Sequence, residues 1–455
     1  MIQTIIPAWE PATHMLGSVN ACAEGSSTRL FTYAKRLSTD GQALYFHVLT
    51  RELVAIPLEE EALPETQDWL RAHRFLVSEG ADDYKLVRQV RSVLRLMNRR
   101  TGTLKGFVVF TTTDCNARCF YCFEKGCQRI SMSLETADAA ADFIKRRSKG
   151  QPVRIEWFGG EPLYNLPVID RICERLDESG VDFFSIIITN GYLFDDAMVQ
   201  KAVKLWKLKA AQITLDGTEA VYNRTKAFIY PGVNAYQTVK ANIGRLLDAG
   251  INVSVRLNID RYNADDLMTL TDELADDYGG RQGLSVYAHP LFEWTLTGVD
   301  LEKRRREVYA LHRRLEEKLR ACGLRKPRRL AHQLPLNRCM ADNGKSMTIL
   351  PDGRTGMCDH LTRSEIVGSI WSDQEDAAAI ARTVEQADDI PACASCAAYP
   401  QCMRLKHCPD EPSCFPELQQ QRIAELEEGI LTEYARWKQN DGAAPDKEEQ
   451  EEASC

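Results

Sequence analysis

The chain has 455 residues, 44% hydrophobic and 27% charged, an ordinary composition for a soluble globular protein of about three domains. Its 57 Lys and Arg residues against 65 Asp and Glu residues give a net charge of -8, which argues against nucleic acid as a partner. No apolar run is long enough for a membrane span and the N-terminus lacks the pattern of a secretory signal, so we expect a cytoplasmic protein without membrane contact. Fifteen cysteines in that compartment favour metal ligation or redox chemistry over structural disulfides.

The first 105 residues are expected to form a small α+β domain of their own. A strand at 44–49 is followed by helices at 63–76 and 84–97, the second with apolar residues at helical spacing.

Six apolar strands alternate with amphipathic helices between residues 106 and 300. The predicted strands are 107–113, 153–158, 183–189, 211–215, 252–259 and 284–289. This alternation predicts an α/β fold with a parallel sheet covered by helices, open or curved into a partial barrel. Ligands of such folds bind at the carboxyl ends of the strands.

The remaining chain divides into three predicted segments. Residues 301–335 form a basic helical connector, interpreted as a solvent-exposed helix face, with docking of an acidic partner as the alternative. Residues 336–438 form a cysteine-rich domain that ends in a helix, and 439–455 form a disordered acidic tail.

The first cysteine group has the spacing C-x3-C-x2-C and follows the first strand of the array. Cys115, Cys119 and Cys122 place three thiolates on one loop, one ligand short of a closed zinc site or a fully ligated iron–sulfur cube. A [4Fe–4S] cluster held by three cysteines leaves one iron open for a non-protein ligand. The alternative is a zinc site in which Cys127 is the fourth ligand, and the role of Cys127 stays open.

Further motifs follow the later strands in order. They are GGEP at 159–162, TNG at 189–191, TLDG at 214–217 and RLNID at 256–260. Together with the cysteine triplet and Tyr121, this order resembles the radical S-adenosylmethionine (radical SAM) superfamily over about residues 107–300. The resemblance implies a partial (β/α)6 barrel that binds S-adenosylmethionine (SAM) and one [4Fe–4S] cluster, held by Cys115, Cys119 and Cys122.

The resemblance also implies roles for residues at the strand ends. Tyr121 would lie by the adenine, and residues 159–161 would hydrogen-bond the methionyl amino group. Thr214 and Asn258 would contact the ribose or the carboxylate. Relatives often carry a His-Asp or His-Asn pair where this chain has residues 222–226, so the cation that meets the carboxylate stays open. The candidate cofactor-binding residues are Tyr121, Gly159, Gly160, Glu161, Asn190, Thr214, Arg224 and Asn258.

The second cysteine group, at 339–414, resembles the SPASM extension of radical SAM enzymes. The resemblance implies two auxiliary [4Fe–4S] clusters, which makes three clusters in all. The ligands of the first would be Cys393, Cys396, Cys402 and Cys414. The second would have only three, Cys339, Cys358 and Cys408. Five residues separate Cys402 from Cys408 where the family usually has three.

Alternatives for this second group also stay open. The cluster with three ligands is completed either by a substrate cysteine or by Cys322, and structural zinc sites are the alternative to clusters. Asp359, directly after Cys358, is a candidate catalytic proton acceptor or else a turn aspartate.

The resemblance implies an enzyme, a peptide maturase. Reductive cleavage of SAM would give a radical that takes hydrogen from a ribosomally made precursor peptide, whose leader the N-terminal domain would recognise. Flavodoxin or ferredoxin would be the reductant. A cysteine thioether crosslink of the sactipeptide or ranthipeptide type is the first expectation, ahead of carbon–carbon crosslinking, epimerisation or sulfatase-type Cys or Ser oxidation. A non-catalytic iron–sulfur electron carrier or a zinc-stabilised binding protein is the alternative of a different class.

Overall fold

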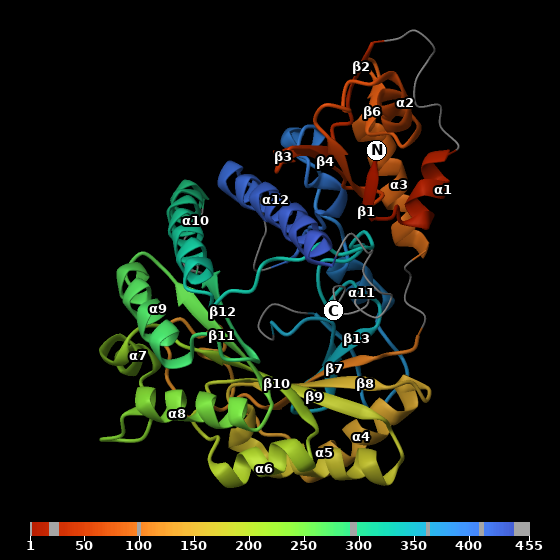
Figure 1. Ribbon diagram of the computed structural model, residues 1–455. Helices are drawn as coiled ribbons and strands as arrows, with labels where there is room; N and C mark the ends of the chain where they lie inside the picture. Colours follow the sequence, from red (N-terminus) through yellow and green to blue (C-terminus); the bar gives the residue numbers. More distant parts are fainter. Residues whose placement is uncertain are drawn as a thin grey trace. The chain divides into compact units, whose positions relative to one another are not determined.

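The computed structural model describes residues 2–17, 27–97, 102–291, 298–360, 365–408 and 414–440 (Figure 1). Cys22, Cys455 and nearly all of the predicted acidic tail lie outside the described residues. None of the described helices is long and apolar enough to cross a membrane.

The chain forms two compact units. The sheet unit comprises residues 100–326 and 339–385, and the terminal unit comprises 1–99, 327–338 and 386–455. The chain therefore passes from one unit to the other four times, at 99/100, 326/327, 338/339 and 385/386. This division groups the predicted segments differently, because the cysteine-rich segment 336–438 contributes to both units.

The sheet unit is built on a nine-stranded sheet with the order β12-β11-β10-β9-β8-β7-β13-β14-β15. The six predicted strands are all present and pair in parallel in chain order. Their bounds are β7 Gly106–Thr112, β8 Val153–Gly159, β9 Phe183–Thr189, β10 Leu208–Thr214, β11 Asn252–Ile259 and β12 Leu284–Pro290. The predicted α/β fold is confirmed.

Three short strands that the sequence did not predict extend this sheet beyond β7. β13 (Ser346–Ile349) pairs in parallel with β7, and β14 (Arg354–Gly356) and β15 (Ile366–Ser369) follow antiparallel. Because β13 covers its outer edge, β7 is an interior strand, and all seven of its residues are buried. The cysteine loop therefore leaves the sheet from one of its most fully packed strands.

Helices alternate with the strands and pack along the sheet (Figure 1). Several begin at a side chain that caps the first turn, as Ser133, Asp195 and Asn234 do for α4, α6 and α8. Their bounds are α4 Leu134–Ser148, α5 Leu166–Glu178, α6 Asp196–Lys204, α7 Glu219–Lys226, α8 Ala235–Asp248, α9 Ala264–Tyr278, α10 Gly298–Ala321 and α11 Ala377–Thr383.

The predicted basic connector consists of α10 and the segment after it, and several of its polar side chains bond to neighbouring elements. In α10, His312 lies 3.1 Å from the carbonyl of Ala288 on β12, and Glu316 accepts the Ala288 N–H at 2.7 Å. After the helix, Arg325 pairs with Glu316 at 3.1 Å. In the terminal unit, Arg329 pairs with Glu433 at 3.1 Å. These ion pairs support a structural role for part of the basic run.

The terminal unit is built on a four-stranded antiparallel sheet with the order β1-β5-β4-β3. The bounds are β1 Gln3–Ile6, β3 Ala34–Thr39, β4 Gln42–His47 and β5 Leu53–Pro57, with a small second sheet of β2 Thr28–Leu30 and β6 Leu76–Ser78. Its helices are α1 Glu10–Gly17, α2 Pro64–Ala72, α3 Asp83–Met97 and α12 Pro416–Gln439.

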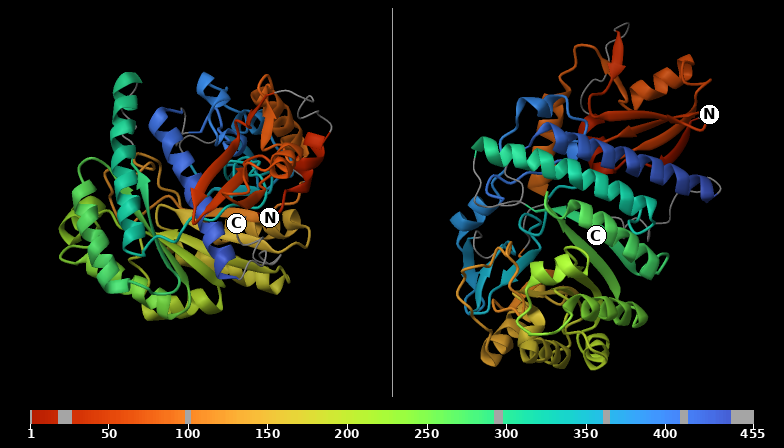
Figure 2. Two further views of the ribbon diagram at one scale, coloured as in Figure 1. Left: turned by 45° about the horizontal axis from the view of Figure 1, so that its top comes forward. Right: turned by 90° about the vertical axis from the view of Figure 1, so that its left-hand side faces the viewer.

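Both faces of this four-stranded sheet are covered. On one face, α12 packs Leu426 and Ile430 into a core with Ile5 and Phe46, and Figure 2 shows α12 beside the N-terminal strands in both views. On the other face, the core that contains Tyr45 and Val87 also holds Cys393 and Tyr399. Segments from both ends of the chain thus share one core.

Candidate cluster and cofactor site

The cysteine triplet lies in the irregular segment that follows β7. Cys115, Cys119 and Cys122 are partly buried free thiols. Burial raises the pKa of the Cys115 thiol to about 12, and the charges of Glu161, Cys119 and Cys122 add to the rise. The three thiols are therefore close enough to act on one another electrostatically, as ligands of one centre would be.

Two main-chain hydrogen bonds tie this loop to the end of α7. The N–H of Arg118 donates to the carbonyl of Lys226 at 2.8 Å, and the N–H of Ile229 donates to the carbonyl of Asn116 at 2.9 Å. The loop is thereby held between the β7 end and the α7 end.

Gly159 and Gly160 allow the end of β8 to lie directly against the base of the loop. Gly159 has a φ of +128°, and a Cβ there would lie 2.2 Å from the carbonyl oxygen of Thr112. A Cβ on Gly160 would lie 2.3 Å from the carbonyl oxygen of Asp114. No larger residue fits at either position without moving the backbone that leads into the cysteines.

Glu161 is fully buried and its carboxylate is held by three donors of the chain. They are the Leu163 N–H at 3.2 Å, the Thr189 hydroxyl at 2.8 Å and the Asn190 N–H at 2.8 Å. Burial raises the pKa of Glu161 to about 7, although these donors act to lower it. The carboxylate therefore joins the ends of β8 and β9 in a fixed geometry.

Asn190 connects this carboxylate to the cysteine loop. Its side-chain amide donates to the Asn116 side chain at 2.6 Å and lies 3.9 Å from the Cys115 sulfur. The predicted residues of β8 and β9 therefore meet the first cysteine of the triplet.

A buried polar network joins the other strand ends. The Tyr121 hydroxyl donates to Asp216 at 2.5 Å and accepts from Lys226 at 2.9 Å, and Lys226 pairs with Asp216 at 3.0 Å. Asn258 donates to Asp216 at 3.1 Å and to the Tyr121 hydroxyl at 3.3 Å. Only 5% of the Lys226 side chain and 1% of the Asp216 side chain are exposed.

This network contains two of the predicted residues, Tyr121 and Asn258, and two that the sequence did not single out, Asp216 and Lys226. The candidate cation Arg224 lies on the same helix as Lys226 but is exposed. The buried cation of the site is therefore Lys226.

Thr214, the remaining predicted residue, ends β10 and is half-buried beside Arg256 of β11. Arg256 donates to the Asn258 side chain at 2.9 Å. Thr214 therefore lies beside the network and is connected to it through Arg256, its neighbour on β11.

The auxiliary cysteines divide between the two units. Cys393, Cys396, Cys402 and Cys414 lie in the terminal unit. Burial raises the pKa of Cys396, and the other three thiols add to the rise, so the four lie near one another. This is the set that the resemblance assigns to one cluster.

Cys339 and Cys358 flank the β13–β14 hairpin in the sheet unit, whereas Cys408 lies in the terminal unit. Burial, Asp359 and Cys339 raise the pKa of Cys358, and the Cys358 thiol lies 3.6 Å from the Asp359 carboxylate. The candidate proton acceptor Asp359 thus contacts a proposed cluster ligand.

Cys322 lies in another part of the sheet unit. Leu324, two residues later, accepts a hydrogen bond at 2.9 Å from Val286 of β12, the last strand at one edge of the sheet. Five strands separate β12 from β13 in the sheet order. This placement argues against Cys322 as a further ligand beside Cys339 and Cys358.

The donor set fits iron–sulfur chemistry. The described cysteines in both groups are soft thiols that form no disulfide. Among the described residues, no group of three or more His, Cys, Asp or Glu side chains already has the geometry of a metal site. The ligand assignments therefore stay predictions.

Residues 109–274 match the family model of the Radical SAM superfamily. The chain contains a radical SAM domain. Such domains use SAM for radical chemistry and bind it together with a [4Fe–4S] cluster. The superfamily expected from the motifs is thus confirmed, and the domain accounts for the convergence of the strand-end residues on the cysteine loop.

Two curated proteins are similar to parts of this chain. An uncharacterized protein of Methanocaldococcus jannaschii is 28% identical over 118 residues, 26% of this chain and 40% of that protein. A probable GTP 3′,8-cyclase of Methanococcus maripaludis is 27% identical over 149 residues, 32% of this chain and 47% of that protein. The alignments span less than half of either relative.

Solved structures show the same fold over a longer stretch. Native anSMEcpe with bound AdoMet and Cp18Cys peptide superposes with a TM-score of 0.55 at 14% identity, covering 74% of this chain and 99% of that one. The same protein with AdoMet alone gives a TM-score of 0.53 at 13% identity, covering 73% and 98%. The likeness at this identity concerns the fold.

Proposed function

We propose that this protein is a radical SAM enzyme that modifies a ribosomally made precursor peptide, with a cysteine thioether crosslink as the expected product. The observation that carries the proposal is the convergence of buried strand-end residues on a loop of three free thiols. An electron carrier would need the thiols but not Glu161, Asn190 or the buried network of Lys226 and Asp216.

The residues of the domain have distinct tasks in this proposal. Cys115, Cys119 and Cys122 would hold the first cluster. With one electron from a flavodoxin or ferredoxin, the bound cluster and SAM would supply a 5′-deoxyadenosyl radical for taking hydrogen from carbon. Glu161 fixes the strand ends around the methionyl group, and Lys226 offers a buried positive charge for a carboxylate.

The two auxiliary centres complete a set of three clusters. Cys393, Cys396, Cys402 and Cys414 close one of them. The resemblance assigns Cys339, Cys358 and Cys408 to the other, which would leave a position for the sulfur of a substrate cysteine, a soft ligand that iron binds readily. The remoteness of Cys322 in the sheet order supports this open position.

A peptide is the substrate class that best fits the fold. The neighbour anSMEcpe was solved with a peptide as well as AdoMet. In the terminal unit, β3 has β4 as its only neighbour among the described strands, so its outer edge is available for an extended leader segment. Carbon–carbon crosslinking, epimerisation and sulfatase-type oxidation are the alternative outcomes on the same substrate class.

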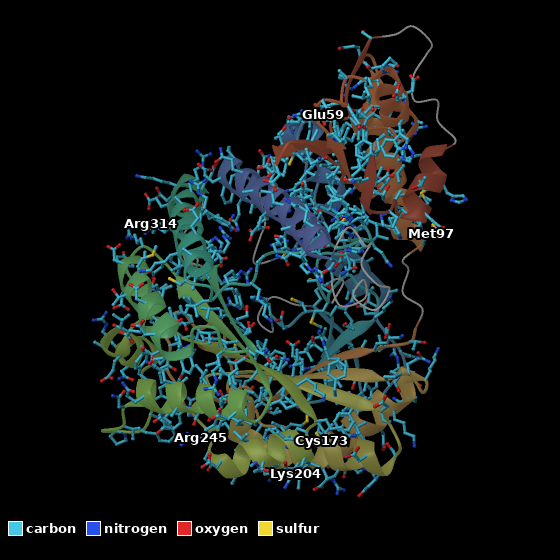
Figure 3. All side chains as sticks on the ribbon, in the orientation of Figure 1. Glu59, Met97, Cys173, Lys204, Arg245 and Arg314 are labelled. Carbon is cyan, nitrogen blue, oxygen red and sulfur yellow. The ribbon has the colours of Figure 1, made fainter. Side chains whose placement is uncertain are left out.

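Replacing Cys115, Cys119 and Cys122 together by Ala tests the proposal. The variant should lose about a third of its iron and all release of 5′-deoxyadenosine from SAM under anaerobic reduction, since one of three clusters is removed. Cys173→Ala is the matched control, because Cys173 is buried on α5 away from both cysteine groups along the chain (Figure 3). Unchanged iron or persistent SAM cleavage in the triple variant would contradict the proposal, and a wild type that binds iron without cleaving SAM would indicate a carrier.

A further inference from the structure

The first turns of α12 lie against the four-cysteine group of the terminal unit. Arg422, in the second turn, donates from Nη1 to the sulfur of Cys402 at 2.7 Å. The helix α12 thus places a positive charge directly against a sulfur of this group.

Other positive groups surround the same cysteines. The Arg404 side chain is buried, with 8% of the residue exposed, and donates to the carbonyl of Asp388 at 2.6 Å. Arg91 of α3 donates to the carbonyl of Cys402 at 2.7 Å. The N-terminus of α12 follows Cys414 closely, and its N-cap Phe415 has no side chain that could accept from the first-turn amides.

The first cysteine loop has a different electrostatic environment. Its nearby buried cation, Lys226, is paired with Asp216 at 3.0 Å. Arg118, inside the loop, donates to the carbonyls of Cys115 and Ala117 and not to a sulfur. Among the described residues of these two cysteine groups, a guanidinium therefore contacts a cysteine sulfur only at Cys402.

We propose that Arg422 is a positioning residue that raises the reduction potential of the auxiliary cluster held by Cys393, Cys396, Cys402 and Cys414. The inference rests on the proposed function, which supplies that cluster. Reduction adds one electron to the cluster, and a guanidinium donating to a ligand sulfur stabilises the added charge. The cluster then accepts an electron more readily than it would without Arg422.

The test uses the full chain with Cys115, Cys119 and Cys122 replaced by Ala, so that only auxiliary clusters remain. Arg422→Gln in this background should keep its iron and show a cluster whose equilibrium constant for reduction falls about tenfold, a shift of about 59 mV to lower potential for one electron. The shift is measured by titration with dithionite, followed by electron paramagnetic resonance.

Two further variants separate charge from position. Arg422→Lys retains the charge and should stay nearer the wild-type potential than Arg422→Gln. Lys438→Gln removes a positive charge from the same helix at a side chain that is 50% exposed and paired with Asp40, and should leave the potential unchanged.

An Arg422→Gln variant with full iron and an unchanged potential would overturn the inference and leave the proposed function intact. If that variant loses iron, Arg422→Met provides a second neutral side chain, and loss of iron from both would overturn the inference in favour of a purely structural role. Absence of auxiliary iron from the parent triple variant itself would instead contradict the proposed function.

Discussion

Lys226 and Asp216 form a buried ion pair, and water cannot take the place of either partner because both side chains are almost fully buried. Removing one partner of such a pair costs about 3–5 kcal/mol, because the other charge stays buried and uncompensated. Lys226→Met should therefore lower the free energy of unfolding by about this amount and weaken SAM binding at least tenfold. Urea unfolding and equilibrium dialysis with SAM measure the two effects.

Adding Asp216→Asn to Lys226→Met separates stability from binding. The double variant should recover most of the stability, since no buried charge is left alone, but not the affinity for SAM. Arg224→Met, on the exposed side of the same helix, is the control and should change neither quantity. Recovery of SAM affinity in the double variant would show that Lys226 acts only through folding.

Sequence reasoning named most of the side chains that the structure brings together here, but on α7 it named Arg224, which is exposed, and not Lys226, which is buried. Tyr121, Glu161, Asn190 and Asn258 do come together with the cysteine loop. Lys226 was missed although its spacing offered a signal. It lies four residues after the buried Tyr222, on the same face of α7, whereas a residue two positions after Tyr222 lies on the opposite face.

The hairpin of β3 and β4 determines which amides of β3 are available to a partner. Its turn residues Asp40 and Gly41 have φ values of +48° and +73°, as a two-residue type I′ turn requires. Val48 donates to the carbonyl of Tyr33 at 3.0 Å, so these two residues form a hydrogen-bonded pair. In an antiparallel ladder every second residue of a strand bonds to the partner strand, and along β3 these are the odd-numbered residues. The N–H of Ser38 therefore faces away from β4.

Ser38→Pro should weaken binding of a precursor peptide at least tenfold, about 1.4 kcal/mol, because it removes an outward amide from the edge of the sheet. Ser38→Ala loses the same hydroxyl but keeps the amide, so it should bind as the wild type does. Isothermal titration of the peptide into both variants measures the difference. Equal affinities would rule out leader pairing at β3.

At the scale of elements, the long periodic segments were predictable and the short ones were not. All six parallel strands were found because each is a run of seven or eight mostly apolar residues in a regular alternation with helices. β13 to β15 have only three or four residues each, within a segment whose cysteines and turn residues hide any apolar pattern. Their strand identity depends on pairing with β7, a contact between distant parts of the chain.

At the scale of the whole molecule, the N-terminal segment and the four-cysteine loop depend on each other. The Tyr33 hydroxyl donates to the carbonyls of Cys393 and Ala394 at 3.3 and 3.2 Å, and Cys393 and Tyr399 are part of the same core as Tyr45. The sequence alone suggested a separate first domain, since linear order gives no sign that residues near 393 complete its core.

Deletion of residues 1–97 should therefore cost the auxiliary iron as well as peptide binding, because it removes most of the core around Cys393. Iron content per chain, compared with that of Ser38→Pro, measures this effect. Ser38→Pro should retain full iron while it loses peptide affinity. A truncated chain that keeps all of its iron would show that the cysteine loop folds without the N-terminal strands.

The four passages of the chain between its two units also bear on how such a protein can change over evolution. A single recombination event exchanges everything on one side of a breakpoint, but each unit here is encoded in more than one separate stretch of the gene. Neither unit can be acquired from or donated to another gene by one crossover. Changes in peptide recognition should therefore accumulate by substitution within the terminal unit. Residues at the β3 edge and residues around the four cysteines should change together, because both belong to that unit.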